Sequence, residues 1–219
     1  MNRQPRSFFA RPVLDVAADL LGCVVTTKSA DGPVSVRLTE VEAYDGPNDP
    51  ASHAYRGPTP RTEVMFGPPG FLYVYFTYGM HWCANLVCGP AGTASAVLLR
   101  AGEVVAGHEL ARTRRPACKA DRDLARGPAR LAGCLALRGE DSGADLCIPH
   151  APLVVAAPLS TVEQPAVRSG PRVGISTAID WPWRFWLDGE PTVSSYRPAV
   201  RRNRSKSTAA VRQTDRSER

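Results

Sequence analysis

The segment VSVRLTEVEAY, residues 34–44, alternates apolar and polar side chains, a pattern typical of a β-strand with one face in the core. Side chains repeat every second residue along a strand, so one face is expected to carry Val34, Val36, Leu38, Glu40, Glu42 and Tyr44. The apolar half of that face can anchor the strand in the core. Its polar half would then point into a cavity at the end of the strand.

The two acidic side chains on this strand need an explanation. A buried carboxylate without a partner is costly, and it usually has either an ion-pair partner or a chemical task. For Glu40 or Glu42 alone, a structural salt bridge is an adequate explanation. Both together, beside Tyr44 and ahead of a loop rich in Gly and Pro that contains His53, indicate a functional site.

Outward from this strand, the sequence predicts an α+β fold. A helix is expected over residues 12–22, where apolar residues recur at helical spacing, and a strand over residues 23–29 precedes a turn at residues 30–32. Further strands are expected over residues 71–78, 81–88, 95–105, 153–157, 172–176 and 183–187, and helical segments over residues 107–115 and 127–137. The order holds few strict βαβ units, which favours a single domain with a mainly antiparallel, curved sheet, a protruding β-hairpin and surrounding helices.

The charge of the chain is unevenly distributed. Of the 219 residues, 43% are hydrophobic and 22% charged, as in an ordinary globular protein. The formal net charge is +6, and residues 197–219 hold eight Lys and Arg against two Asp and Glu, so residues 1–196 sum to zero. We expect a folded domain over residues 1–196 and a basic, disordered tail over residues 197–219. The tail would act either as a solubilising extension or as a loose grip on phosphates.

Two further features bound the class of protein. No apolar run has the length of a membrane span and the N-terminus lacks a signal-peptide pattern, so we expect a cytoplasmic protein without membrane contact. The six cysteines include no CxxC pair, which favours free, partly buried thiols. The spacing of His81, Cys83 and Cys88 fits no common zinc pattern, and no metal or other cofactor is expected.

The segment FLYVYFTYGMHWCANLVC, residues 71–88, predicts an aromatic hairpin that turns at Gly79 and Met80. Tyr73 and Tyr75 share one strand face, and Tyr73 is interpreted as a core residue. Tyr78 lies beside the turn, where a large side chain would protrude and could stack on nucleobases or wedge between them.

Two polar residues could complete a pocket. Asn85, on the return strand of the hairpin, has an amide that could read the edge of a base. Arg100, at the end of the run AVLLR, could neutralise a pocket carboxylate, although an arginine at a sheet edge is an equally good interpretation of that position.

Four blocks of the chain together resemble the alkyladenine (3-methyladenine) DNA glycosylase family of base-excision repair. They are EVEAYDGPNDPASHAYRG (residues 40–57), TPRTEVMFGPPGFLYVYFTYGMHWCANLV (59–87), AVLLRAGE (96–103) and SGPRVGIS (169–176). The likeness extends from about residue 12 to residue 193, and its two specific patterns, EAYxGPxDxAxH and LYVYxxYGMxxCxN, occur in order and at a suitable separation.

The resemblance implies a role for each matching residue. Glu42 would be the general base, helped by Arg100 and by the backbone near Val173 to hold the attacking water. The base pocket would be formed by Tyr44, His53 and Tyr75, with Asn85 discouraging guanine. Tyr78 would intercalate into the duplex, and Met80 and His81 would contact DNA. His81 stands where some relatives have Tyr, a departure that concerns the DNA contact at the hairpin tip and not the chemistry.

The resemblance therefore implies an enzyme that binds double-stranded DNA containing damaged purines, associated with the nucleoid if the source is a bacterium, and we take it to be a monomer. A stacked nucleotide cannot be attacked at C1′, so the base would be flipped into the pocket. No lysine lies in the matching blocks, which implies a monofunctional glycosylase that leaves an abasic site.

Two other interpretations stay open at the level of sequence. Glu40 and Glu42 could be the carboxylate pair of a sugar glycosidase, since same-face neighbours on a strand lie about 6.5–7 Å apart. The chain could also be a non-catalytic protein that recognises damaged DNA through its hairpin and tail.

Overall fold

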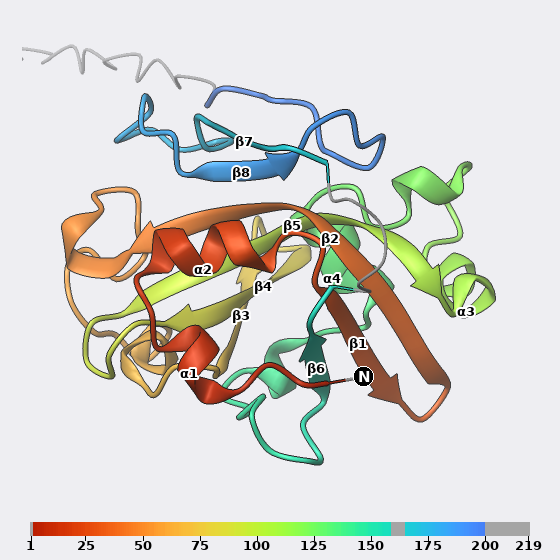
Figure 1. The fold of residues 1–219 in the computed structure, drawn as a ribbon, viewed down its shortest axis with the longest axis horizontal. Coiled ribbons are helices and arrows are strands. Elements are labelled where there is room, and N and C mark those ends of the chain that lie inside the picture. The colour runs from red at the N-terminus through yellow and green to blue at the C-terminus, as the bar shows by residue number, and fades with distance from the viewer. Residues whose placement is uncertain (1, 159–164, 200–219) are drawn as a thin grey trace, which may run out of the picture.

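The computed structural model describes residues 2–158 and 165–199 and places the strands of this part of the chain in one sheet (Figure 1). The strands are β1 (Val24–Ser29), β2 (Gly32–Asp45), β3 (Leu72–Thr77), β4 (His81–Cys88), β5 (Ser95–Ala106), β6 (Leu153–Ala156), β7 (Val167–Gly170) and β8 (Arg184–Leu187). Their order is β3–β4–β5–β2–β1–β6, with β8 paired to β2 and β7 paired to β8. Each pairing between them is antiparallel, so the predicted α+β class with a mainly antiparallel sheet is confirmed.

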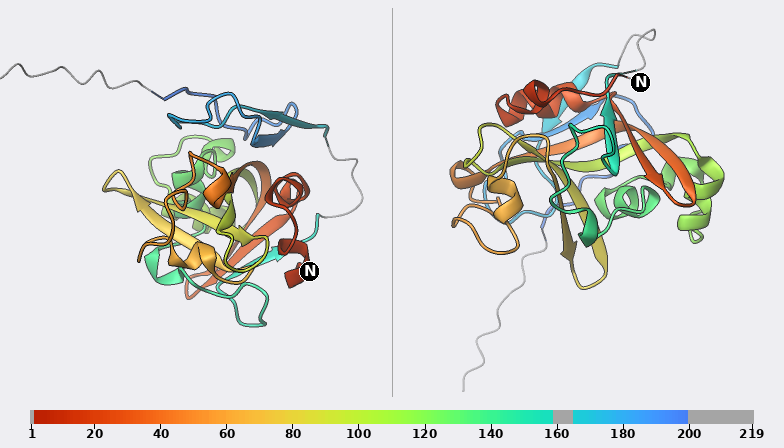
Figure 2. Two further views of the ribbon diagram at one scale, coloured as in Figure 1. Left: turned by 90° about the vertical axis from the view of Figure 1, so that its left-hand side faces the viewer. Right: turned by 90° about the horizontal axis from the view of Figure 1, so that it is seen from below.

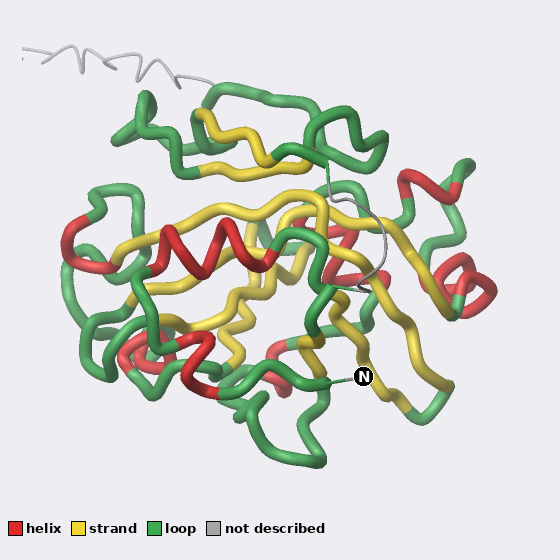
Figure 3. Tube along the Cα trace, viewed as in Figure 1, coloured by secondary structure: helices red, strands yellow, loops and turns green. Residues whose placement is uncertain are grey.

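Short helices surround this sheet and are joined by long loops (Figure 3). They are α1 (Arg6–Phe9), α2 (Val13–Leu20), α3 (His108–Arg114) and α4 (Pro128–Cys134), and the last three confirm the predicted helical segments. In α2 the buried side chains recur at helical spacing, because one stripe of the helix packs on the core: Val13, Val16, Ala17 and Leu20. The helices of the described residues include none with both the length and the apolar character that crossing a membrane requires.

Strand β2 lies at the centre of the fold. One edge pairs along its length with β5, while the other edge pairs with β1 over residues 32–37 and with β8 over residues 40–42. The two ends of β2 therefore have different neighbours. The half that carries the acidic side chains lies between β5 and the C-terminal hairpin of β7 and β8, which packs against the body in Figure 1.

The prediction that one face of β2 carries Val34 through Tyr44 at even positions is wrong. Register shifts interrupt the β2–β5 ladder. Leu38 lies opposite Gly102 and Glu40 lies opposite Ala101, so Thr39 is an extra residue in β2 that has no partner. Arg100, in β5, is likewise without a partner, and the ladder resumes beyond it. An extra residue in a strand moves all later side chains to the opposite face. The main core accordingly contains the even positions up to Leu38 and then Val41 and Ala43. The bulge turns Glu40, Glu42 and Tyr44 away from that core.

The β3–β4 hairpin projects from the body of the molecule, as Figure 2 shows, and this prediction is confirmed. The turn itself begins one residue earlier than expected, since β3 ends at Thr77 and Thr77 pairs with His81. Tyr78 and Gly79 both adopt positive φ, at 51° and 68°. Tyr78 is 83% exposed, which confirms the prediction that a large aromatic side chain protrudes here.

In the C-terminal third, the strand expected over residues 172–176 is wrong, and most of the expected tail lies outside the described residues. Residues 172–176 form no strand, because the backbone N–H of Val173 donates to a side chain of β2 instead of joining a ladder. The strand in this region is β7, which ends at Gly170. Of the tail expected over residues 197–219, the part from residue 200 onward lies outside the described residues.

The cysteines are free, as expected from their spacing. Four of them are buried and two are half-buried, and none takes part in a disulfide: Cys23, Cys83, Cys88, Cys118, Cys134 and Cys147. Burial raises the pKa of the Cys23 and Cys134 thiols to about 11, so both behave as small apolar side chains at neutral pH.

Candidate active site

A cavity of about 540 Å³ opens beside the second half of β2, the β3–β4 hairpin and the loop after β7. Nine of the ten predicted site residues line it: Glu42, Tyr44, His53, Tyr75, Tyr78, His81, Asn85, Arg100 and Val173. The tenth, Met80, lies outside the cavity at the tip of the hairpin and is 66% exposed. Residues from five separate segments of the sequence thus meet around one hollow.

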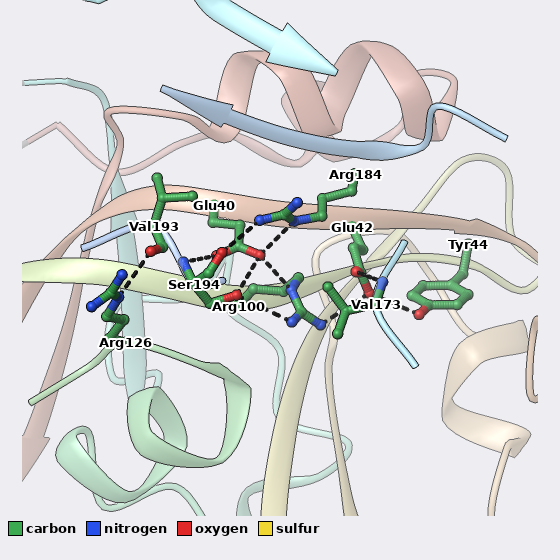
Figure 4. A network of polar contacts seen from close by, with 9 residues as sticks. All are labelled: Glu40, Glu42, Tyr44, Arg100, Arg126, Val173, Arg184, Val193 and Ser194. Atoms are coloured by element: carbon green, nitrogen blue, oxygen red, sulfur yellow. Dashed lines mark hydrogen bonds and ion pairs between the residues drawn. The ribbon is translucent and has the colours of Figure 1, made fainter. Parts of the chain in front are cut away.

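Glu42 is fully buried and is held from three sides (Figure 4). Its Oε1 accepts a hydrogen bond from the backbone N–H of Val173 at 2.7 Å. Its Oε2 accepts one from the Tyr44 hydroxyl at 2.9 Å and lies 3.2 Å from Nη1 of Arg100. An ionised carboxylate has about four acceptor positions. The two hydrogen bonds fill two of them, and the Arg100 contact is an ion pair, so an acceptor position remains for a further donor such as water.

Arg100 connects the two acidic residues of β2. Its Nε donates to Glu40 Oε1 at 2.7 Å, while its Nη1 faces Glu42. Burial alone would lower the pKa of the Arg100 guanidinium, but the charges of Glu42 and Glu40 hold that pKa above its ordinary value. The guanidinium therefore stays charged although it is only 5% exposed.

Glu40 has a different environment from Glu42. Its carboxylate accepts from Nε of Arg100 and Nε of Arg184, each at 2.7 Å, and from Ser194 through both its backbone N–H at 2.6 Å and its hydroxyl at 2.9 Å. Burial would raise the pKa of this carboxyl, but Arg100 and Arg184 hold the pKa below its ordinary value. Glu40 is thus a saturated, ionised acid that does not line the cavity.

Aromatic side chains form the walls of the cavity. The rings of His53 and Tyr75 meet edge to face, with centroids 4.7 Å apart, and Tyr73 stacks on Tyr75 at 5.5 Å. Burial raises the pKa of both Tyr44 and Tyr75 above the ordinary tyrosine value, and nearby Glu42 adds to the effect. Both phenols therefore stay neutral at physiological pH and present uncharged ring faces.

Two polar side chains border these walls. His53 is exposed as a residue, yet partial burial of its imidazole and the charge of Arg61 lower its pKa, so the imidazole is neutral at pH 7. The Asn85 amide is 4% exposed and donates to the Tyr73 carbonyl oxygen at 3.1 Å. That bond orients the amide toward one edge of the cavity.

Sequence reasoning missed the residues that hold this site from behind. Arg172 is fully buried, binds the Ala43 carbonyl oxygen and pairs with Asp49, and it lies 4.6 Å from the ring centroid of Tyr44. Arg184 and Ser194 hold Glu40. The only signal in the sequence was an arginine inside the apolar run WRFWL, residues 183–187. Within the described residues no group of three or more His, Cys, Asp and Glu could hold a metal ion.

The comparisons with known proteins agree with this geometry. Residues 7–191 match the family model of methylpurine-DNA glycosylases. A protein from Streptomyces avermitilis is 58% identical over 200 residues, covering 91% of this chain and 94% of its own length. Proteins from Frankia casuarinae (56% over 202 residues; 89% and 93%) and Leifsonia xyli (52% over 200 residues; 88% and 92%) are also similar. All three carry the provisional name 3-methyladenine DNA glycosylase.

A curled antiparallel sheet with an acid inside an aromatic cavity therefore defines a DNA glycosylase, a hydrolase that acts on N-glycosyl bonds in base-excision repair. The chain belongs to the methylpurine-DNA glycosylase family.

Proposed function

We propose that the protein flips alkylated purines out of duplex DNA and hydrolyses the N-glycosidic bond with a water activated by Glu42, leaving an abasic site. One observation carries the proposal: Glu42 is fully buried, lines the aromatic cavity and keeps an acceptor position for a further donor. A base still stacked in the duplex would be out of reach of that carboxylate.

The reaction needs a nucleophile and a stabilised sugar cation. In the proposed step the water oxygen bonds to C1′ while the bond from C1′ to the purine nitrogen breaks. Glu42 takes the proton of the water, and the bonding electron pair goes to the purine, where it cancels the positive charge of an alkylated base. General-base help of this kind contributes about 10²–10⁴-fold. The Glu42 anion also stabilises the positive charge that develops on the sugar.

The walls of the cavity suit a cationic base. The electron-rich ring faces of Tyr44 and Tyr75 would attract an N3- or N7-alkylated purine by cation–π interaction, which is worth roughly 0.5–2 kcal/mol. A neutral His53 adds no repulsion. Asn85 would oppose guanine through its amide.

Three residues at the hairpin tip would contact the duplex. Tyr78 is the proposed wedge, because an 83% exposed ring beside the cavity mouth can replace the extruded base in the stack. Met80 and His81 lie on the same tip and would touch the strands on either side.

Hydrolysis without a lyase step also follows from the residues present. A lyase step needs an amine that forms a Schiff base with C1′. The three lysines of the chain are Lys28, Lys119 and Lys206, and among the residues that the structure describes none of those lining the cavity is a lysine. We therefore propose a monofunctional enzyme.

The carboxylate-pair alternative loses its support. A sugar glycosidase needs both acids to reach the substrate. The acceptor positions of Glu40 are filled by Arg100, Arg184 and Ser194, and Glu40 does not line the cavity.

The test is base release from methylated duplex DNA by the full chain and by Glu42→Gln. We expect the unmodified protein to release 3-methyladenine and 7-methylguanine, and the variant to lose release while it still binds the lesion duplex. Glu63→Gln changes an exposed acid at the start of the short 3-10 helix before β3, serves as the control and should keep full release. A chain that binds damaged duplex but releases no base would instead be a non-catalytic binder. Unchanged single-turnover rates in Glu42→Gln would contradict the role of that residue.

A further inference from the structure

Glu40 does not line the cavity, but its carboxylate is held as firmly as that of Glu42, which does. Glu40 and Glu42 are both 0% exposed, and Arg100 lies between them, with its Nε hydrogen-bonded to Glu40 and its Nη1 in an ion pair with Glu42. Arg184, from β8, contacts Glu40 with its Nε at 2.7 Å and donates with its Nη2 to the Ser194 carbonyl oxygen at 2.8 Å.

The charges of this buried cluster balance. Glu40 and Glu42 contribute two negative charges, and Arg100 and Arg184 contribute two positive charges. The arginines are each 5% exposed, so solvent screens these charges weakly. Without Glu40, the same group would carry a net positive charge directly behind the carboxylate of Glu42.

We propose that Glu40 is a charge-balancing and positioning residue, which neutralises one guanidinium so that Glu42 presents a negative field to a cation in the cavity. The inference rests on the proposed function and deepens it, because it names a second acid on which the selectivity for positively charged substrates depends. Its lowered pKa is consistent with an acid that stays ionised through the reaction.

Glu40 can act on the reacting atoms through its charge although it does not touch them. A cationic purine that leaves its sugar brings one positive charge into the site, and that charge shifts to the sugar as the bond breaks. Donors and charges fixed in a site with little water act strongly on such a charge. One uncompensated positive charge within about 10 Å would weaken the binding of a cation by about tenfold at an effective dielectric constant of roughly 20.

The experiment measures charge preference directly. The probes are two DNA duplexes that differ at one abasic position: one carries a pyrrolidine ring, whose nitrogen is protonated at neutral pH, and the other carries neutral tetrahydrofuran. The ratio of the two dissociation constants reports the field in the cavity. Because both duplexes are titrated into the same preparation, the ratio does not depend on the fraction of folded protein.

Three full-length variants change the charge of the cluster in steps. Glu40→Gln makes it one unit more positive, Arg184→Gln makes it one unit more negative, and the double variant restores balance. We expect the preference for the cationic duplex to fall about tenfold in Glu40→Gln, to stay or rise in Arg184→Gln, and to return close to the unmodified value in the double variant.

Two results would overturn the inference. An unchanged ratio in Glu40→Gln would show that its charge does not reach the cavity. A ratio in the double variant as low as in Glu40→Gln would mean that lost contacts, rather than charge, cause the effect. Failure of the proposed function would look different, because the unmodified protein would then release no methylated purine whatever its charge preference.

Discussion

Arg172 and Asp49 form an ion pair that is wholly shielded from solvent. Both side chains are 0% exposed, and Nη2 of Arg172 donates to Oδ1 of Asp49 at 2.8 Å. The guanidinium also lies over the ring of Tyr44, and the next residue, Val173, donates its backbone N–H to Glu42. This pair therefore ties the loop after β2 to the loop after β7 at the point where the candidate general base is held.

Breaking this pair should destabilise the protein strongly. Arg172→Met keeps a long side chain against the ring of Tyr44 but leaves the Asp49 carboxylate buried without its partner. Loss of one member of a buried pair costs about 3–5 kcal/mol of the free energy of unfolding. Chemical denaturation at neutral pH measures that loss.

A solvent-exposed arginine–aspartate ion pair provides the control. Arg168 and Asp188 form an ion pair at 2.9 Å whose side chains are 59% and 49% exposed. Arg168→Met should change the free energy of unfolding by less than about 1 kcal/mol. The double variant Arg172→Met with Asp49→Asn should recover part of the loss. Equal effects of the buried and the exposed substitutions would contradict this account.

Tyr78 at the hairpin tip should contribute to DNA binding but not to the stability of the fold. Tyr78 adopts φ 51°, a conformation that glycine accepts without strain. We therefore expect Tyr78→Gly to leave thermal stability unchanged or slightly higher. Binding to a lesion-containing duplex should weaken by about tenfold, since a stacked aromatic side chain contributes roughly 1–3 kcal/mol. Differential scanning calorimetry and fluorescence anisotropy measure the two effects.

The specificity of that effect can be tested on the same hairpin. Phe76 is 45% exposed, and its ring packs on Trp82 at a centroid distance of 4.7 Å. Phe76→Ala removes a comparable exposed aromatic ring that does not line the cavity, so lesion binding should change little. Tyr78→Gly should also lose more affinity for the duplex than for single-stranded DNA. Equal losses on both forms of DNA would argue against a wedge.

The parts of the fold that follow from short-range pattern were predictable. The existence of strand β2, the aromatic hairpin and the helical spacing in α2 follow from adjacent residues, and the structure has all three, although the two faces of β2 are not those that the alternation predicts. The bulge at Thr39 was not predictable, because the alternation of the sequence continues through it. The extra residue shows only in the pairing of β2 with β5, and β5 has a register shift of its own at Arg100.

The same limit applies to the site. The motif blocks brought nine residues to the cavity, because each block encodes its own strand or loop. The supporting pairs join residues that are far apart in sequence: Arg172 and Asp49 are separated by 123 positions, and Arg184 and Glu40 by 144. Nothing local in the chain marks such partners. An arginine in an apolar strand is a signal for a buried partner but does not identify it.

The basic C-terminal segment should affect DNA binding through salt. Residues 197–219 carry eight Lys and Arg against two Asp and Glu. Each phosphate contact that releases a counterion adds about 0.9 to the slope of log affinity against log salt on duplex DNA. A chain that ends at residue 197 should therefore bind duplex DNA more weakly at low salt and with a shallower slope. A slope that does not move would leave the segment with a solubilising role.

The imidazole of His53 should make stability depend on pH in a way that Arg61 controls. Burial and the charge of Arg61 lower the pKa of His53 below its ordinary value of 6.5, and Arg61 also lies 5.1 Å from the ring centroid of Tyr75. Above pH 6.5 the imidazole is neutral in both the folded and the unfolded chain, so it contributes nothing. As the pH falls below that value the unfolded chain takes up a proton first, and the folded state loses stability until its own imidazole titrates.

Two substitutions test whether Arg61 lowers the pKa of His53 and whether His53 causes this pH dependence of stability. Arg61→Met should raise the pKa of His53 toward 6.5, measured by NMR titration of the imidazole protons with His53→Gln to identify the signal among the four histidines. The same variant should lose less unfolding free energy than the unmodified protein between neutral pH and about pH 5, and His53→Gln should remove this part of the pH dependence. If the pKa of His53 does not rise in Arg61→Met, the arginine does not hold that imidazole neutral. The cavity would then owe its uncharged wall to burial alone.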